Sequence, residues 1–201
     1  VLSKNILKDI ESADVVIFVG GLDATWEGEE SNKMRVHNGV DGFFGGDRTK
    51  IELPEVQQNA LIEISKTGKP IIFVLLAGSA ISFNGLEDKL DGILAAWYPG
   101  QRGGDAVADV LFGKYNPAGR LPITFYSSTN ELGDFEDYNM RAGKGLTYRY
   151  YNGEALFPFG HGMSYTKFHY SGLTINSATV SNNDEIYVSV KVKNIGELDG
   201  E

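Results

Sequence analysis

The chain of 201 residues contains no cysteine, which excludes disulfide scaffolds, thiolate metal sites and cysteine nucleophiles. Its three histidines are too dispersed for a zinc-binding pattern. No apolar run approaches the roughly 20 residues that a helix needs to cross a bilayer. Basic residues are outnumbered 27 to 18 by acidic ones, so the chain lacks the electrostatic footprint of a nucleic-acid binder. No metal ion, cofactor or nucleic acid is therefore expected.

In the first half of the chain, short β-branched runs alternate with helical patterns. Residues 14–21 hold a continuous run of mostly β-branched residues, apolar from Val15 to Val19 and closed by glycines, which predicts a strand buried on both faces. Further strands are expected at 70–77 and 92–97. Helices are expected at 6–13, 54–66 and 104–112, with a short one at 86–90. This alternation predicts an α/β fold with a mostly parallel sheet and helices on both faces, an α/β sandwich.

The second half of the chain changes character and suggests a second domain. An edge strand is expected at 120–126, then a polar loop, then an aromatic-rich stretch at 147–159. Residues 168–175 and 185–193 alternate as strands, which predicts the beginning of a β-sandwich. We expect a truncated α/β domain at 1–126, a linker wrapping the domains at 127–167 and a truncated sandwich at 168–201. The chain is thus expected to be a piece of a longer protein.

The loop after the first strand is the segment best suited to chemistry. Ligands bind open parallel sheets outside the carboxyl ends of the strands, which here carry residues 20–26, 77–84 and 98–103. The loop at 22–46 is long and places four carboxylates beside Trp26: Asp23, Glu27, Glu29 and Glu30. A carboxyl group against an apolar ring is suited to donate a proton, and the ring is suited to stack on a sugar. The alternative is a solvated acidic loop with a packed tryptophan. The spacing of a calcium loop is absent.

Several separate motifs, in order along the chain, together resemble the C-terminal part of glycoside hydrolase family 3. These motifs are Gly46-Asp47-Arg48, Trp97-Tyr98-Pro99-Gly100, Gly119-Arg120-Leu121-Pro122 and Phe157-Pro158-Phe159-Gly160-His161-Gly162. The family comprises β-glucosidases and β-xylosidases. The end of the chain is similar to the fibronectin type III-like domain that follows in many members.

This resemblance implies the acid/base-bearing portion of a retaining, exo-acting β-glycosidase. Retaining enzymes use two carboxyl groups about 5 Å apart. The family's nucleophilic aspartate lies on an N-terminal barrel that this chain does not contain, so the chain alone is expected to be inactive. The acid/base glutamate lies on the loop after an early strand. An acidic residue, a short gap and then Glu-Gly favours Glu27, with Glu29 as runner-up and Glu30 third.

The resemblance also suggests substrate-binding residues and partners. Trp26, Asp47 and Arg48 are candidates for shaping the sugar pocket, although the interpretation favoured for Asp47 and Arg48 is a structural one, in which they tie the return of the loop to the following helix. The expected partners are a β-glycoside or oligosaccharide and the barrel of the same parent chain. Polysaccharide breakdown would suit a periplasmic or secreted enzyme, but the sequence does not identify the compartment.

Two other classes of function remain open at this level. One is a carbohydrate-binding or scaffolding module without catalysis. The other is a flavodoxin-like nucleotide binder, which fits the parallel sheet but lacks a loop that cradles phosphate. The tyrosines at 148, 150 and 151 are interpreted as packing residues between domains, because aromatic rings serve this role more often than they bind sugars.

Overall fold

A computed structural model describes residues 2–24, 26–27, 42–44 and 47–201. The chain divides into two compact units. The first comprises Val1–Val107 and Leu121–His161, and the second comprises Ala108–Arg120 and Gly162–Glu201. The domain boundaries expected from the sequence remain predictions.

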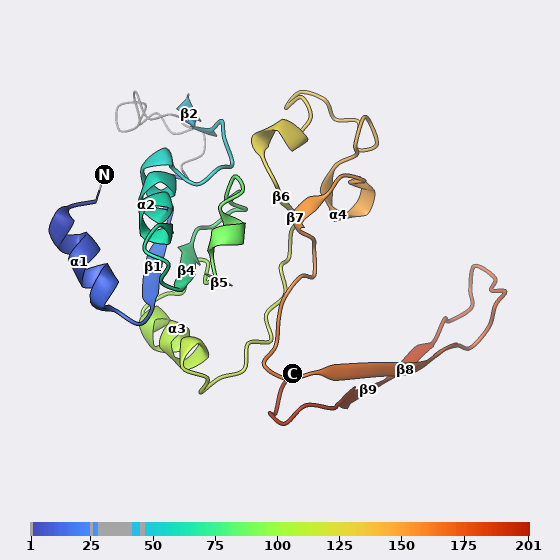
Figure 1. Cartoon of the computed structure of the whole chain (residues 1–201). Coiled ribbons are helices and arrows are strands. Elements are labelled where there is room, and N and C mark those ends of the chain that lie inside the picture. The colour runs from blue at the N-terminus through green and yellow to red at the C-terminus, as the bar shows by residue number, and fades with distance from the viewer. Residues whose placement is uncertain (1, 25, 28–41, 45–46) are drawn as a thin grey trace. The chain divides into compact units, whose positions relative to one another are not determined.

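A three-stranded parallel sheet forms the centre of the first unit, with β4 (Ile71–Leu76) between β1 (Val16–Gly21) and β5 (Gly92–Ala95). Figure 1 shows the three strands side by side. Gly21 pairs with Leu76, and Leu75 pairs with Ala95, so the three strands end at the same edge of the sheet. This arrangement confirms the predicted α/β class.

The strands differ in burial, and one sequence prediction is wrong. Phe73 and Val74 of central β4 are fully buried. In β1, however, Ile17 and Val19 are 44% and 59% exposed. The strand predicted to be buried on both faces is therefore an edge strand in which exposed and half-buried side chains alternate. An apolar sequence allows a strand to be buried, but the actual burial depends on the elements that pack around it. In the described sheet, β1 has a neighbouring strand on one edge only.

Helices α1 (Lys4–Ser12), α2 (Glu55–Ser65) and α3 (Gly103–Leu111) follow the sequence prediction within one or two residues. A 3₁₀ turn (Glu87–Lys89) replaces the short helix expected at 86–90. Helix α2 begins after Pro54, carries Glu55 in its positive first turn and buries Leu61 and Ile64. These side chains join one hydrophobic core with Phe73 of the sheet.

Short antiparallel pairs complete the first unit. Strands β2 (Phe43–Phe44) and β3 (Asp47–Arg48) pair with each other, and so do β6 (Phe125–Tyr126) and β7 (Ala155–Phe157). The expected edge strand at 120–126 is reduced to β6. A 3₁₀ turn (Thr129–Glu131) and the four-residue α4 (Thr147–Tyr150) lie between β6 and β7.

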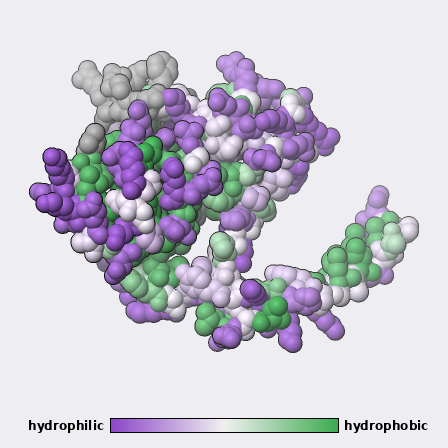
Figure 2. Space-filling view, in the orientation of Figure 1, coloured by the Kyte–Doolittle hydropathy of each residue, from purple (hydrophilic) through white to green (hydrophobic). Residues whose placement is uncertain are grey.

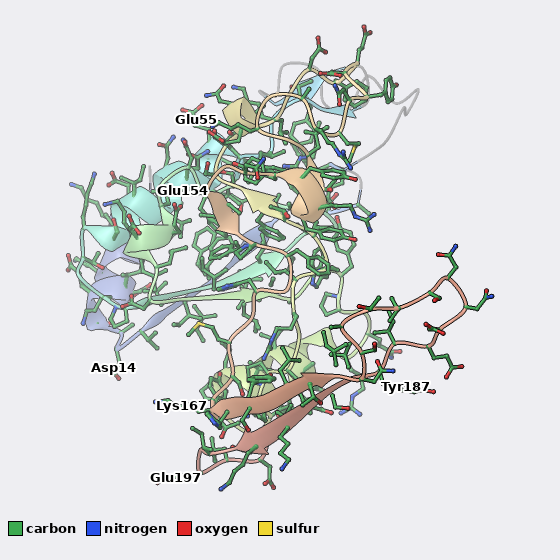
Figure 3. The ribbon with its side chains drawn as sticks, turned by 90° about the vertical axis from the view of Figure 1, so that its right-hand side faces the viewer. Asp14, Glu55, Glu154, Lys167, Tyr187 and Glu197 are labelled. Carbon is green, nitrogen blue, oxygen red and sulfur yellow. The ribbon has the colours of Figure 1, made fainter. Side chains whose placement is uncertain are left out.

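The second unit contains an antiparallel hairpin of β8 (Phe168–Ile175) and β9 (Val188–Asn194), as the sequence predicted. Figure 3 shows Lys167 and Glu197 at one end of this ribbon and Tyr187 at the other. Several large side chains along it are exposed: Tyr170, Ile175, Val188, Val190 and Val192. Figure 2 shows hydrophobic surface, in green, over this ribbon. An isolated two-stranded ribbon is only marginally stable in water, so this surface calls for further packing.

Candidate active site

The exit from β1 is fixed by contacts that leave room only for glycine. A Cβ atom on Gly21, whose φ is +126°, would lie 2.0 Å from the Leu76 carbonyl oxygen. The side-chain amide of Gln57 in α2 donates to the Gly21 carbonyl and accepts from the Gly21 N–H, each at 2.8 Å. The chain then turns, because the N–H groups of Trp26 and Glu27 both donate to the Asp23 carbonyl, at 3.0 and 3.1 Å.

The turn directs the Glu27 side chain towards the loops after β4 and β5. Its Oε2 accepts hydrogen bonds from the Gly78 N–H at 2.7 Å and from the Tyr98 hydroxyl. Its Oε1 accepts a hydrogen bond from the Ser79 hydroxyl. Three loops at the carboxyl edge of the sheet therefore meet at one carboxylate.

A guanidinium group completes this site. Arg48 Nη1 lies 3.7 Å from Glu27 Oε1 and donates to Ser79 Oγ at 2.5 Å. The Arg48 and Glu27 side chains are only 13% and 12% exposed. Arg48 Nη2 is buried and has no hydrogen-bond partner among the described residues. We call Arg48, Gly78, Ser79 and Tyr98 the Glu27 cradle.

Two backbone features make the cradle specific to its sequence. A Cβ atom on Gly78 would lie 2.8 Å from Glu27 Oε2 and 2.7 Å from the Tyr98 ring, so a larger residue would displace one of them. Trp97, directly before Tyr98, has a φ of +54°, a left-handed conformation that a bulky residue rarely adopts. The Trp97 ring packs edge-on against Phe125, with ring centroids 6.3 Å apart.

The cradle also perturbs its own titratable groups. Burial raises the pKa of Tyr98 to about 12, and the hydrogen bond to Glu27 and the negative charge of that residue act in the same direction. Tyr98 therefore remains a neutral phenol at neutral pH. Burial lowers the pKa of Arg48, against the opposing charges of Glu27 and Glu52.

The structure brings together part of the predicted site. Glu27 and Arg48 lie at the same place, and Trp26 lies next to Glu27 in the chain. The Trp26 ring packs edge-on against Phe43, with ring centroids 5.4 Å apart. Asp47 lies in β3, where it pairs with Phe44. Glu29 and Glu30 lie outside the described residues.

Three residues of the cradle were not singled out from the sequence. Gly78, Ser79 and Tyr98 fall in the loop segments predicted at the carboxyl ends of the second and third strands. That prediction located the segments, and Tyr98 stood in a motif of the family resemblance. Nothing in the sequence identified which side chains would reach Glu27.

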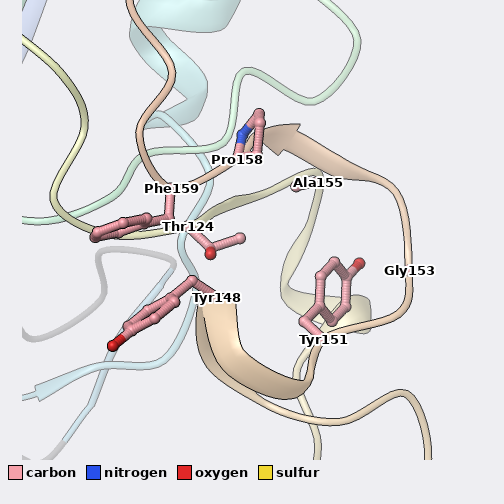
Figure 4. Close-up of a pocket in the computed structure, with 7 residues that line it drawn as sticks. All are labelled: Thr124, Tyr148, Tyr151, Gly153, Ala155, Pro158 and Phe159. Carbon is pink, nitrogen blue, oxygen red and sulfur yellow. The ribbon is translucent and has the colours of Figure 1, made fainter. Parts of the chain in front are cut away.

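A separate cavity of about 320 Å³ lies in the 121–161 part of the first unit. Figure 4 shows the Thr124 side chain between Phe159 and Tyr148 on one side and Tyr151 on the other. Tyr148 and Phe159 stack with ring centroids 4.4 Å apart. None of the lining residues belongs to the Glu27 cradle: Thr124, Tyr148, Tyr151, Gly153, Ala155, Pro158 and Phe159.

Two kinds of site are not found in the part of the chain that the structure describes. No group of three or more histidine, aspartate or glutamate side chains is placed to hold a metal ion there. None of the helices in those residues has the length and apolar character needed to span a bilayer.

Comparison with known proteins identifies relatives of the chain. The family model described as the glycosyl hydrolase family 3 C-terminal domain matches residues 2–165. The chain is 46% identical over 195 residues to a xylan 1,4-beta-xylosidase of Xylanibacter ruminicola, which covers 96% of this chain and 21% of the relative. It is 37% identical over 200 residues to a periplasmic beta-glucosidase of Salmonella typhimurium, covering 94% of this chain and 24% of the relative.

Comparison with solved structures finds proteins of the same kind as the sequence comparison. A beta-glucosidase from Listeria innocua in complex with glucose superposes with a TM-score of 0.76 at 26% identity. The match covers 100% of this chain and 28% of that one. The chain thus spans between a fifth and three tenths of the length of the relatives it matches.

Proposed function

The chain belongs to glycosyl hydrolase family 3, and we propose that it is the acid/base-bearing portion of a retaining, exo-acting β-glycosidase that hydrolyses O-glycosyl bonds. The observation that carries this proposal is the Glu27 cradle, in which a largely buried carboxyl group lies at the carboxyl edge of a parallel sheet. The names of the similar proteins include a xylosidase and a glucosidase, which supports a substrate of the β-xyloside or β-glucoside type.

The proposed chemistry needs two carboxyl groups on two domains. The nucleophile attacks the anomeric carbon, and the acid/base protonates the departing oxygen and later takes a proton from water. We assign the acid/base to this chain and the nucleophile to a barrel elsewhere in the parent protein. The isolated chain then has no meaningful hydrolase activity, and appreciable turnover of a nitrophenyl β-glycoside by the purified chain would contradict this division.

Glu27 is our first candidate for the acid/base. Its location after β1 and its contacts with the loops after β4 and β5 support it. Arg48 lies beside the carboxyl group, and Trp26 precedes it in the chain, so both are proposed to shape the sugar pocket, together with Asp47.

Glu29 is the second candidate, and one observation favours it. Both oxygens of Glu27 accept hydrogen bonds from their own domain, and its side chain is only 12% exposed. A proton donor must reach the glycosidic oxygen of the substrate, directly or through one water molecule. If Glu27 only holds the loop in place through these hydrogen bonds, a later carboxyl group of the same loop is proposed to donate the proton. Glu30 is the third candidate for the acid/base.

Chemical rescue in the complete parent enzyme separates these candidates. Glu27→Ala, Glu29→Ala and Glu30→Ala are compared on aryl β-glycosides of decreasing leaving-group ability. Loss of the acid/base lowers kcat/KM most for poor leaving groups, by about 100-fold or more, because their departure depends on the proton. Azide then restores turnover on an activated substrate and forms a glycosyl azide. The variant that shows both effects identifies the residue, and rescue of Glu29→Ala alone would refute Glu27.

A binding or scaffolding module is the alternative function. Under that function, the parent protein would bind oligosaccharides and none of the three variants would change the rate of hydrolysis. This alternative would be favoured if the parent sequence had no barrel pattern and no suitably placed aspartate.

We further propose that residues 168–201 begin a fibronectin type III-like domain. The β8–β9 hairpin with its exposed apolar side chains supports this, because a second sheet would cover them. Limited proteolysis of the parent protein tests it, since cleavage within a folded sandwich should be slow.

A further inference from the structure

The cavity in the 121–161 region is lined mainly by aromatic rings. Tyr148 and Phe159 stack on each other at one side of it, and their side chains are 54% and 48% exposed, so the cavity is open to solvent. Tyr151 lines the other side (Figure 4). The volume of about 320 Å³ lies at the lower end of the range for small-molecule sites, which suits a ligand the size of one monosaccharide.

One buried polar side chain faces this cavity without a partner. Thr124 is only 8% exposed, and its side chain projects between the rings of Tyr148 and Tyr151 (Figure 4). The Thr124 hydroxyl makes no hydrogen bond to another residue that the structure describes. A buried hydroxyl group without a hydrogen bond costs free energy. A ligand that carries hydroxyl groups of its own would remove this cost.

The backbone that presents Tyr148 to the cavity is strained. Thr147 has a φ of +58°, in the left-handed region that a β-branched residue rarely adopts. Its N–H donates to the Tyr126 hydroxyl at 2.9 Å, which holds this conformation in place. Just before it, a Cβ atom on Gly145 would lie 2.0 Å from the Tyr150 carbonyl oxygen. Strained residues of this kind cluster at sites that clamp a ligand, because the surrounding structure fixes the neighbouring side chains.

The charges around the cavity favour a neutral ligand. The lining residues carry no charged side chain. The Arg149 guanidinium already lies 5.7 Å from the centroid of the Tyr148 ring, so a cationic ligand would be repelled there. The Tyr151 hydroxyl donates to Glu131, and Lys144 already pairs with that carboxylate. A pyranose fits these surroundings, because its C–H groups pack against aromatic rings and its hydroxyl groups both donate and accept hydrogen bonds.

We propose that this cavity is a second sugar-binding site, which holds one pyranose unit of a β-linked oligosaccharide among the rings of Tyr148, Tyr151 and Phe159 and hydrogen-bonds it through Thr124. The class of ligand rests on the proposed function of the chain as part of a β-glycosidase. None of the lining residues belongs to the Glu27 cradle, so this site binds sugar without cleaving it. It raises the local concentration of long substrates at the enzyme.

The test measures oligosaccharide binding to the complete parent enzyme after a covalent glycosyl aziridine has blocked its active site. Isothermal titration calorimetry gives the Kd for xylohexaose and for cellohexaose. We expect Tyr148→Ala to weaken the binding of at least one of them by about 10-fold. Thr124→Val, which keeps the shape of the side chain and removes its hydroxyl, should weaken it by about 5-fold. Tyr138→Ala is the matched control, because Tyr138 is 87% exposed and lies in the same region without lining the cavity. Its Kd should stay within about 2-fold.

Three results of this titration would overturn the second site. They are the absence of binding to the blocked enzyme, binding that neither Tyr148→Ala nor Thr124→Val weakens, and an equal loss in Tyr138→Ala. The first result is expected if another domain of the parent protein packs against these rings. In that case Tyr148→Ala would lower the melting temperature of the parent protein and leave sugar binding unchanged.

Hydrolysis of a nitrophenyl β-xyloside and a nitrophenyl β-glucoside separates this inference from the proposed function. Tyr148→Ala should keep kcat/KM on these small substrates within about 2-fold, because they do not reach a second site. A loss of kcat/KM as large as the loss of binding would place Tyr148 in the active site and overturn the inference. A parent protein that hydrolyses neither substrate and does not react with the aziridine refutes the proposed function. Oligosaccharide binding that Tyr148→Ala weakens would still support the second site.

Discussion

Two tyrosine–glutamate pairs in the first unit use the same hydrogen bond in different surroundings. Tyr98 donates to Glu27 at the carboxyl edge of the sheet, and Tyr151 donates to Glu131 in the 121–161 region. Burial raises the pKa of both tyrosines to about 12.

The surroundings of the two carboxylates separate the pairs. Glu131 is joined by Lys144, whose side chain is 57% exposed. Glu27 is joined by a backbone N–H, a hydroxyl and the largely buried Arg48. A perturbed tyrosine alone therefore does not mark a site; the convergence of several loops on one buried carboxylate does.

Substitution of Gly78 should give the largest effect on this comparison. Gly78→Ala places a methyl group within 3 Å of both Glu27 Oε2 and the Tyr98 ring, so the carboxyl group must move. We expect kcat/KM of the parent enzyme to fall by about 100-fold, because misplacement by about 1 Å costs that much.

Gly133→Ala provides the control in the 121–161 region, where a Cβ atom would meet nothing within 4 Å. Its kcat/KM should match that of the unmodified enzyme. Comparable losses of kcat/KM in the two variants would mean that alanine at a glycine position harms the fold in general. The effect of Gly78→Ala could then not be assigned to its proximity to Glu27 and Tyr98.

Removal of the two cations should give an intermediate effect. Arg48→Ala leaves the Glu27 carboxylate without its buried counter-charge, and we expect the melting temperature of the parent enzyme to fall by about 5 °C or more. Lys144→Ala removes an exposed partner of Glu131 and should leave it unchanged. Differential scanning calorimetry measures both. Equal shifts in melting temperature for Arg48→Ala and Lys144→Ala would show that the buried ion pair of Glu27 contributes no more to stability than the exposed pair of Glu131.

Alkaline pH should reveal the smallest effect. Both tyrosines titrate higher in the folded chain than the ordinary value of 10, so their stabilising contribution is complete below pH 10. It is then lost as the pH rises from about 10 to about 12. We expect the melting temperature to fall across this window, and less steeply in Tyr98→Phe and Tyr151→Phe. A slope that neither substitution alters would assign the alkaline loss to other groups.

The sequence predicted the scaffold of the site better than its contacts. Unbroken apolar runs identified β1, β4 and β5, and an amphipathic pattern with an N-terminal proline identified α2. These signals are local, because each strand or helix carries its own periodicity. The prediction that β1 is buried on both faces was wrong because burial depends on the neighbours of a strand.

The meeting of Glu27 with Tyr98 depends on features that no local pattern encodes. It requires the parallel register of three strands, a turn closed on Asp23 and a left-handed residue at Trp97. Tryptophan rarely adopts that conformation, so propensity favours the opposite prediction. The sequence therefore predicted the edge of the sheet, Glu27 and Arg48, but missed the other three residues of the Glu27 cradle, Gly78, Ser79 and Tyr98.

The Gln57 amide has a consequence for the outer edge of the sheet. By donating to and accepting from Gly21, it reproduces the two hydrogen bonds that a neighbouring strand would form there. The backbone N–H and C=O groups of Gly21, the last residue of β1, are thus already hydrogen-bonded to a side-chain amide instead of to another strand. Any polypeptide that extends the sheet beside β1 must end its ladder before Gly21, and the loop bearing Glu27 is shielded from strand addition.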